Sequence, residues 1–255
     1  MKMVDSKVLN ILDGSTIIGN VVKLNSGQLD RKLYADVNKV LEALGGKWNR
    51  KVGGHTFASD PSDIFDEVLL TGEYSPDTTK QDFGVFFTPA WLAEKVVDMA
   101  DIRREDTILE PSAGEGAIAD AVLRRCPWAA PNLDLNEIQP EKVKFIKGKG
   151  YANVLQYDFL SSDFSKAGYD KIVMNPPFAK QADIKHVLKA WELLNAGGRL
   201  VSIMSAAVKF RSTNLTTAFR EIIAKHGVIE DVPEGAFKES GTNVSTVMVV
   251  LDKAA

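Results

Sequence analysis

Short apolar segments alternate with helical patterns through most of the sequence after residue 80, and this alternation constrains the fold more than any other feature. Seven segments have the length and composition of β-strands: DTILE, NLDLNEI, NVLQY, DKIVM, RLVSIMS, GVIEDV and STVMVVLD. Because most of them are separated by helical patterns, they predict an α/β fold with a doubly wound, mostly parallel seven-stranded sheet. The last two are joined by PEGAFKESGTN, which is too short for a crossover helix, so the final strand should run antiparallel.

The first 80 residues do not continue this alternation and predict a smaller unit. A helix is expected from Asp30 to Leu44, where a glycine pair ends it, and a second helix is expected after SDPSD. The segment KWNRKVGGHTF lies between them. We therefore expect two domains, a small N-terminal α+β appendage over residues 1–80 and the doubly wound domain over residues 81–255.

Composition excludes several classes of protein. With 255 residues, 45% of them hydrophobic, the chain can bury one large core and a small second one. A single cysteine, Cys126, excludes an internal disulfide, and His55, His186 and His226 are too scattered for a zinc site. The first residues lack an apolar core long enough for a signal peptide, and nowhere do eighteen apolar residues follow one another. These features predict a cytoplasmic protein without a metal or a membrane span.

The end of the first strand of the sheet carries an acidic residue and a loop of small residues. Glu110 ends the strand, and a helix is expected to begin near Ala117. The loop between them contains Ser112, Ala113, Gly114 and Gly116. Glycines let the backbone approach a ligand closely, and ligands of such sheets bind beyond the carboxyl ends of the strands. The Lys-Ser/Thr of a phosphate-binding loop is missing, and a carboxylate at this point would repel phosphate and attract an amine.

The next two strands also end on acidic residues. Glu137 follows the second strand, where a carboxylate can accept hydrogen bonds from both hydroxyls of a ribose. Asp158 and Phe159 follow the third, where they could bind an exocyclic amine and lie beside an adenine ring. Each acid by itself could be an ordinary solvated side chain. Three acids around one glycine loop instead indicate a nucleoside with an amino-acid tail, a description that fits S-adenosylmethionine.

The fourth strand is followed by the sequence Asn-Pro-Pro-Phe at residues 175–178, which a chain of this length contains by chance on the order of once in a thousand. Such residues also simply end strands and turn the chain. Upstream, GVFFTPAWLAEKVV predicts a helix capped by Thr88 with Pro89 at its first position. Together with the glycine loop, these segments resemble the Rossmann-like class I methyltransferases. Among them they are most similar to small adenine-N6 DNA methyltransferases of phages and mobile elements.

The resemblance implies a role for each residue of this motif. The Asn175 side-chain oxygen and the Pro176 carbonyl would each accept a hydrogen bond from one of the two N–H groups of an adenine amine. These contacts would stabilise the positive charge that develops on its nitrogen. Pro177 restricts Pro176 to an extended conformation, and Phe178 would stack on the target base, flipped out if the DNA is double-stranded. The methyl donor is already activated, so in-line placement suffices without a metal, a nucleophile or a strong base.

The resemblance also implies how the cofactor is held. Phe86 and Thr88 would contact its methionine end, Glu110 its amino group, Glu137 its ribose, and Asp158 with Phe159 its adenine. The remaining contacts would come from Ser112, Ala113, Gly114, Gly116 and Asn175.

The residues that would contact nucleic acid are harder to place. Larger members of the family carry a long recognition region after the catalytic strand, whereas 77 residues follow Phe178 here, and the formal charge of −3 leaves room only for a local contact. One candidate is the N-terminal segment with Lys47, Trp48, Arg50 and Lys51, which combines cations with an aromatic ring. A solvated hairpin whose tryptophan packs on its own small core is an equal alternative. Further candidates, expected near the mouth of the site, are Lys209, Arg211 and Lys238.

Three functions follow, in order of preference. The first is transfer of a methyl group from S-adenosylmethionine to the N6 amine of adenine in DNA, in a restriction-modification or phage setting. The second keeps the fold and the cofactor but methylates RNA or a protein glutamine, because Asn-Pro-Pro-aromatic sequences also serve those substrates. The third is a non-catalytic subunit of a larger modification complex, with a partner that the sequence does not identify.

Overall fold

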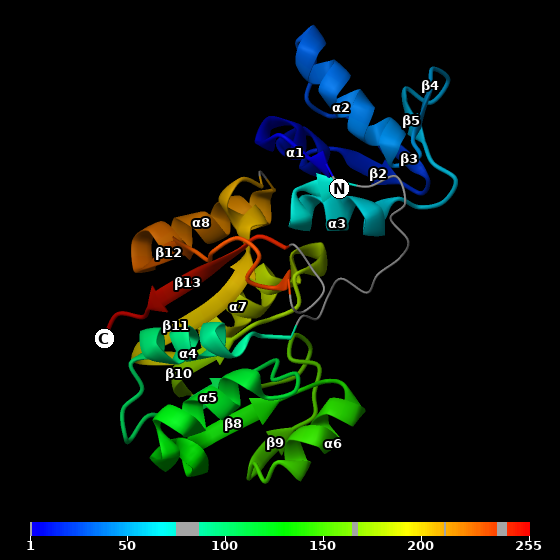
Figure 1. The fold of residues 1–255 in the computed structure, drawn as a ribbon. Coiled ribbons are helices and arrows are strands. Elements are labelled where there is room, and N and C mark those ends of the chain that lie inside the picture. The colour runs from blue at the N-terminus through cyan, green and yellow to red at the C-terminus, as the bar shows by residue number, and fades with distance from the viewer. Residues whose placement is uncertain (1, 75–86, 165–167, 212, 239–243) are drawn as a thin grey trace. The chain divides into compact units, whose positions relative to one another are not determined.

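Three sheets organise the residues that the structure, a computed structural model, describes: 2–74, 87–164, 168–211, 213–238 and 244–255 (Figure 1). The chain forms two compact units. The first comprises residues 1–83 together with 206–218, and the second comprises residues 84–205 and 219–255. The first unit ends near the expected boundary at residue 80, but it also contains residues 206–218, which were expected in the second domain.

The second unit contains the predicted seven-stranded sheet, in the order β12-β13-β11-β10-β7-β8-β9. Its strands are β7 (Ile108–Glu110), β8 (Leu133–Asn136), β9 (Asn153–Leu155), β10 (Tyr169–Met174), β11 (Leu194–Ser205), β12 (Gly227–Asp231) and β13 (Thr246–Asp252). β13 runs antiparallel to both β11 and β12, while β10, β7, β8 and β9 pair in parallel. The expected fold, including the antiparallel last strand, is confirmed.

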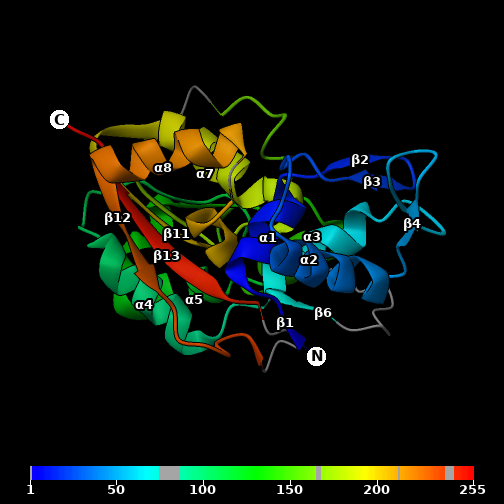
Figure 2. The ribbon, with the colours of Figure 1, turned by 90° about the horizontal axis from the view of Figure 1, so that it is seen from above.

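Helices cover both faces of this sheet. Those of the second unit are α4 (Ala90–Ala100), α5 (Ala117–Arg125), α6 (Pro140–Gly148), α7 (Ala182–Leu193) and the part of α8 (Asn214–His226) from Phe219 onward, with the short 3₁₀ helices η1 (Pro127–Asn132) and η2 (Ala179–Gln181). The 3₁₀ helix η3 (Ala206–Lys209) belongs to the first unit. Figure 2 shows α4 and α5 on one face of the sheet and α7 on the other. β13 is a run of β-branched and other apolar residues that is buried from Thr246 to Leu251, as expected for a strand covered on both sides.

The first unit has a four-stranded antiparallel sheet in the order β2-β3-β5-β4 and a two-stranded sheet of β1 and β6. Its elements are β1 (Lys2–Met3), α1 (Ser6–Asp13), β2 (Thr16–Ile18), β3 (Val21–Lys23), α2 (Arg31–Ala43), β4 (Lys47–Asn49), β5 (Gly54–Thr56), α3 (Ser62–Thr71) and β6 (Glu73–Tyr74). The predicted helix after Asp30 is α2, and the Asp30 carboxylate caps it by accepting from Lys32 N and Leu33 N, both at 3.0 Å. Apolar residues from all three helices and both sheets, together with Phe210 from the late segment, form its core.

None of the helices in the described ranges has the length and hydropathy of a membrane span.

Candidate functional site

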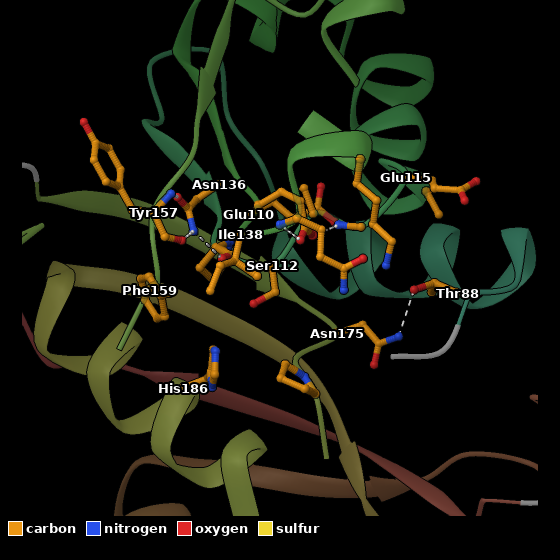
Figure 3. A pocket seen from close by; sticks show the side chains of 18 of the residues that line it. Thr88, Glu110, Ser112, Glu115, Asn136, Ile138, Tyr157, Phe159, Asn175 and His186 are labelled. Atoms are coloured by element: carbon orange, nitrogen blue, oxygen red, sulfur yellow. Dashed lines mark hydrogen bonds between the residues drawn. The ribbon is translucent and has the colours of Figure 1, made fainter. Parts of the chain in front are cut away.

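A cavity of about 460 Å³ opens at the carboxyl ends of β7, β8 and β10 and the loop after β9, within the second unit (Figure 3). β7 lies between β10 and β8, so the strand order reverses here, and sheets of this kind bind ligands at that position. The volume falls in the usual range for sites that hold small molecules and cofactors. The residues around it are Phe87, Thr88, Glu110, Pro111, Ser112, Ala113, Gly114, Glu115, Ala117, Asn136, Glu137, Ile138, Gln139, Lys142, Tyr157, Asp158, Phe159, Asn175, Pro177 and His186.

Glu110 is a buried carboxyl group that borders this cavity from the end of β7. Its side chain is 2% exposed, and its Oε2 atom has no hydrogen-bond partner among the described residues. Burial, with the nearby charges of Asp120 and Glu137, raises the pKa of Glu110 well above its ordinary value. A buried carboxyl with an unsatisfied oxygen favours a cationic ligand group, because an ammonium would supply both the hydrogen bond and the missing positive charge.

The glycine loop is anchored by Glu137. The Oε2 atom of Glu137 accepts a hydrogen bond from Gly114 N at 2.7 Å, and Oε1 accepts one from Gln139 N at 2.9 Å. Gly114 has φ +57° and Gly116 has φ +83°, a region in which glycine carries no steric penalty. Each carboxylate oxygen retains a second lone pair, so the residue predicted to bind a ribose also holds the loop in place.

A second cluster supports the loop from behind. Tyr151 Oη donates to Asp120 Oδ1 at 2.5 Å, and Lys149 Nζ donates to Asp120 Oδ2 at 2.6 Å and to the Glu115 carbonyl at 2.8 Å. A Cβ atom on Gly116 would lie 3.7 Å from both the Lys149 ammonium and the Tyr151 ring. These contacts hold the start of α5, so the loop geometry depends on residues that do not border the cavity.

Asn136 is a residue of the site that sequence reasoning missed. It is 1% exposed, and its Nδ2 donates to the Pro111 carbonyl at 3.0 Å and the Tyr157 carbonyl at 3.1 Å. Its Oδ1 accepts from Tyr157 N at 3.1 Å. One buried amide therefore joins the loops that follow β7 and β9. The available signal was its position: Asn136 is the last residue of the strand, where ligands of such sheets bind.

Phe159 and His186 form one end of the cavity, and Figure 3 shows them away from Thr88 and Asn175. The rings of Phe159 and His186 stack with centroids 5.6 Å apart, and Lys189 Nζ lies 5.4 Å from the Phe159 centroid. His186 Nδ1 is 2.7 Å from the Ala182 carbonyl, which only accepts, so Nδ1 is the donor. Burial lowers the pKa of His186, which favours the neutral ring. His186 is a second residue that the sequence did not single out.

Asp158 lies beside these rings at the rim of the cavity. Its Oδ1 accepts from Leu160 N at 3.0 Å, and a side-chain hydrogen bond from Ser161 is the main cause that lowers the pKa of Asp158. The group is therefore ionised at neutral pH and remains an acceptor at the end where an adenine amine was predicted.

Asn175 and Thr88 are joined across the other end of the cavity. Asn175 Nδ2 donates to Thr88 Oγ1 at 2.9 Å, and Figure 3 shows the Asn175 side-chain oxygen pointing away from Thr88. Thr88 does not cap α4 as predicted: Pro89 is the N-cap residue, without a side-chain hydrogen bond, and the Thr88 hydroxyl instead binds Asn175. Phe86, predicted beside Thr88, lies outside the described residues.

Two further predictions about side chains are corrected by burial. Phe178 was expected to stack on a target base, but it is 1% exposed and, unlike the similarly buried Phe159 (3% exposed), it does not border the cavity in this conformation. Arg211 was expected to contact nucleic acid near the mouth of the site. It is instead 3% exposed and belongs to the first unit, where its Nε lies 3.0 Å from an oxygen of Asp13. A buried arginine that is paired in this way is a structural residue.

The remaining nucleic-acid candidates are all exposed. Lys47, Trp48, Arg50 and Lys51 lie in the first unit, on β4 and the turn after it. Lys209 belongs to the first unit and Lys238 to the second, and neither borders the cavity.

The family of the chain follows from a comparison with known families. The family model of the methyltransferase small domain matches residues 91–228, which include the glycine loop and residues 175–178. The chain belongs to this family. Its sheet order and the position of its cavity agree with the class I methyltransferase fold, and S-adenosylmethionine is the cofactor that this family implies.

Several known proteins are similar to parts of the chain. A type II restriction enzyme and methyltransferase of Heyndrickxia coagulans is 23% identical over 177 residues, 58% of this chain and 28% of that protein. A protein of Methanosarcina mazei, named as a ribosomal RNA small subunit methyltransferase A, is 26% identical over 182 residues, 67% of this chain and 64% of that protein. The chain therefore spans less than two thirds of either relative's length.

The fold is shared with solved structures. The methyltransferase subunit of a type I restriction-modification system from Streptococcus thermophilus superposes with a TM-score of 0.59 over 88% of this chain and 54% of that one, at 16% identity.

The donor set of the cavity fits S-adenosylmethionine. The unsatisfied Glu110 oxygen suits an ammonium, the Glu137 carboxylate suits hydroxyl groups, and the ionised Asp158 beside the Phe159 ring suits an aminated aromatic base. The two ends of the cavity thus match the two ends of that molecule.

Proposed function

We propose that the protein transfers a methyl group from S-adenosylmethionine to the N6 amine of adenine in DNA. The observation that carries the proposal is the position of Asn175. It follows β10 and borders the cavity, its Nδ2 donates to Thr88 Oγ1, and its Oδ1, a buried atom in this conformation, points away from Thr88 and is the acceptor of the amide. A relative named as a type II restriction enzyme and methyltransferase supports DNA as the acceptor.

In this proposal the chain acts mainly by holding the substrate amine. The Asn175 Oδ1 atom and the Pro176 carbonyl each accept a hydrogen bond from one N–H group of this amine. The two hydrogen bonds favour a pyramidal nitrogen and stabilise the positive charge that develops there. Thr88 keeps the amide from rotating, and neither Pro176 nor Pro177 has an N–H group to compete for these acceptors. The bound cofactor supplies an electrophilic methyl group. The carbon–sulfur bond of the cofactor would break as the new C–N bond forms, and the amine would then lose a proton to solvent.

The cofactor contacts are proposed from the same geometry. Glu110 binds the amino group of the methionine tail, Glu137 the ribose hydroxyls, and Asp158 the exocyclic amine of the adenine, with Phe159 beside its ring. The loop at Ser112, Ala113, Gly114 and Gly116 and the hydroxyl of Thr88 complete the site. Because Phe178 is buried, we assign it to packing behind the motif and not to base stacking.

RNA is the second candidate acceptor. The relative from Methanosarcina mazei, named as a ribosomal RNA methyltransferase, matches a larger share of both chains than the restriction-modification relative does. The chemistry proposed for Asn175 and Pro176 is the same for an adenine amine in either polymer.

The test is methyl transfer from tritiated S-adenosylmethionine to separate DNA and RNA pools, with nucleoside analysis of the product. The variant is Asn175→Ala, and the matched control is Asn153→Ala, which removes an asparagine of β9 that does not border the cavity. N6-methyladenosine in RNA, with no methylated adenine in DNA, would show that RNA and not DNA is the acceptor.

We expect Asn175→Ala to lose roughly 10²–10³-fold in turnover, the usual effect of removing one group that stabilises transition-state charge. Its affinity for the cofactor should stay close to that of the wild type, because the lost contact is to the substrate. Near-normal turnover in this variant would show that Asn175 does not hold the amine.

A further inference from the structure

The hairpin formed by β4, β5 and the turn between them, residues 47–56, carries a cluster of exposed cations. Lys47, Arg50 and Lys51 are exposed, and none of the three forms an ion pair within the described part of the chain. Between Glu42 and Asp60 the sequence contains no acidic residue, although the whole chain has a formal charge of −3. The cluster is therefore a local positive surface on a protein that is otherwise slightly acidic.

The turn that presents these cations is held in one conformation. Asn49 Oδ1 accepts from Lys51 N at 3.0 Å, and the Asn49 carbonyl accepts from Gly53 N at 3.0 Å. Gly53 has φ +62°, which favours glycine at this position. Gly54 packs so closely on β3 that an added Cβ would lie 2.5 Å from the Val22 carbonyl. A preorganised turn loses little conformational entropy when a ligand binds.

Trp48 is exposed on the same hairpin, yet it is also held in place. Its side chain is 53% exposed, and its ring lies edge-on to His55, with centroids 5.3 Å apart. His55 is the cross-strand neighbour of Trp48 and is 1% exposed, with its Nε2 atom 2.7 Å from Asn38 Oδ1 on α2. The buried histidine thus supports an indole ring whose remaining surface is open to solvent.

We propose that this hairpin is a DNA-binding element, in which Lys47, Arg50 and Lys51 contact backbone phosphates and Trp48 stacks on an unpaired base or packs on a sugar. Three exposed cations and a fixed aromatic ring on one hairpin match the alternation of charge and flat apolar surface along a nucleic-acid strand. The inference rests on the proposed function, because it assumes that the substrate is DNA. It assigns substrate capture to the first unit and chemistry to the second.

The test uses the full-length protein and fluorescently labelled DNA, as a duplex and as a single strand. The hairpin variant carries Lys47→Ala, Arg50→Ala and Lys51→Ala. The matched control carries Arg31→Ala, Lys32→Ala and Lys39→Ala, which remove the same charge from exposed positions on α2 of the same unit. The affinity of each protein is measured between 50 and 200 mM salt, and thermal denaturation verifies that each is folded.

For three lost phosphate contacts, the slope of log affinity against log salt should fall by about 2.7 on duplex DNA. Over this fourfold salt range, the hairpin variant should therefore lose about 40-fold less affinity than the wild type. The α2 control should retain the wild-type slope. Equal slopes for the wild type and the hairpin variant would overturn the proposal.

A second pair of variants tests the aromatic contact without changing charge. Trp48→Ala should weaken binding of the single strand by about tenfold or more, whereas Trp48→Phe should retain most of the affinity. Equal binding by Trp48→Ala and the wild type would show that the ring is only structural. Binding of RNA with the same affinity and the same loss in the hairpin variant would contradict DNA as the specific partner.

The two proposals fail in different ways. If the protein methylates DNA but the hairpin does not bind it, the hairpin variant methylates DNA with unchanged KM and kcat. If the hairpin binds DNA but the protein does not methylate it, DNA binding shows the expected salt dependence although no methyl group enters DNA.

Discussion

Substitution of Glu110 separates the stability of this protein from its affinity for the cofactor. The Glu110 carboxyl is buried, its Oε2 atom has no hydrogen-bond partner within the described ranges, and burial raises its pKa well above the ordinary value. Without a bound cation, such a group destabilises the folded state. Glu110→Gln keeps the shape and removes the charge, so we expect the variant to be more stable and to bind S-adenosylmethionine more weakly.

The pH dependence follows from the direction of the pKa shift. Between the ordinary pKa of a glutamic acid, about 4.3, and the raised pKa of Glu110, the folded state binds more protons than the unfolded state. The free energy of unfolding therefore falls as pH rises through this window, and glutamine removes that loss. The advantage of Glu110→Gln should grow from acidic pH towards neutrality. Each kcal/mol gained raises the Tm by about 2–4 °C for a chain of this size.

The effect of Glu110→Gln on cofactor affinity is opposite in sign to its effect on stability. Removal of one partner of a buried ion pair costs about 3–5 kcal/mol, so the Kd for S-adenosylmethionine should rise about 10²- to 10³-fold or more. Thermal denaturation from pH 5 to 8 and calorimetric titration of the cofactor measure the two effects. Glu105→Gln, the same change at an exposed position, is the control. Unchanged affinity, or a loss of stability at neutral pH, would refute the assigned role of Glu110.

Three further predictions concern contacts that support the two units. Gly116→Ala should destabilise the protein by about 1 kcal/mol in thermal denaturation, because φ at this position is +83°, and an unchanged Tm would contradict the strain. Tyr151→Phe removes the 2.5 Å hydrogen bond to Asp120 and should raise the Kd of the cofactor while kcat is retained; equal Kd values would rule out a positioning role. Arg211→Ala leaves Asp13 buried without its partner and should cost about 3–5 kcal/mol in urea unfolding, whereas Arg211→Met combined with Asp13→Leu should recover most of it; a stable single variant would argue against the ion pair.

The sheet and the cofactor end of the site could be predicted because their signals are local. The strands β10, β11 and β13 contain runs of buried apolar residues, which have no stable position except inside a covered sheet, and Asp30 caps α2 through backbone groups only two and three residues away. The cavity borders Glu110, Glu137 and Asp158 because the ends of parallel strands meet at one edge.

The unpredicted features depend on partners that are distant in sequence. The Thr88 hydroxyl has a local use, as a helix cap, and a distant one, as a partner for Asn175, which lies 87 residues away. The Thr88 hydroxyl binds Asn175 and does not cap the helix, because the Asn175 amide is held at the end of a central strand and Pro89 occupies the N-cap position. Asn136 and His186 were missed for the same reason, since their roles come from the loops and rings that they contact.

The sequence by itself determined the strand segments of the larger sheet, their mostly parallel direction with an antiparallel last strand, and the residue types at the strand ends, because these follow from local periodicity and from the covalent order of the chain. Only the tertiary structure decided which of the candidate side chains are available to a ligand. Phe178 and Arg211 have the chemistry of contact residues, yet both are buried, whereas Lys47 and Trp48 remain exposed. Burial and pairing depend on every element packed around a residue, and that information is not contained in its neighbours along the chain.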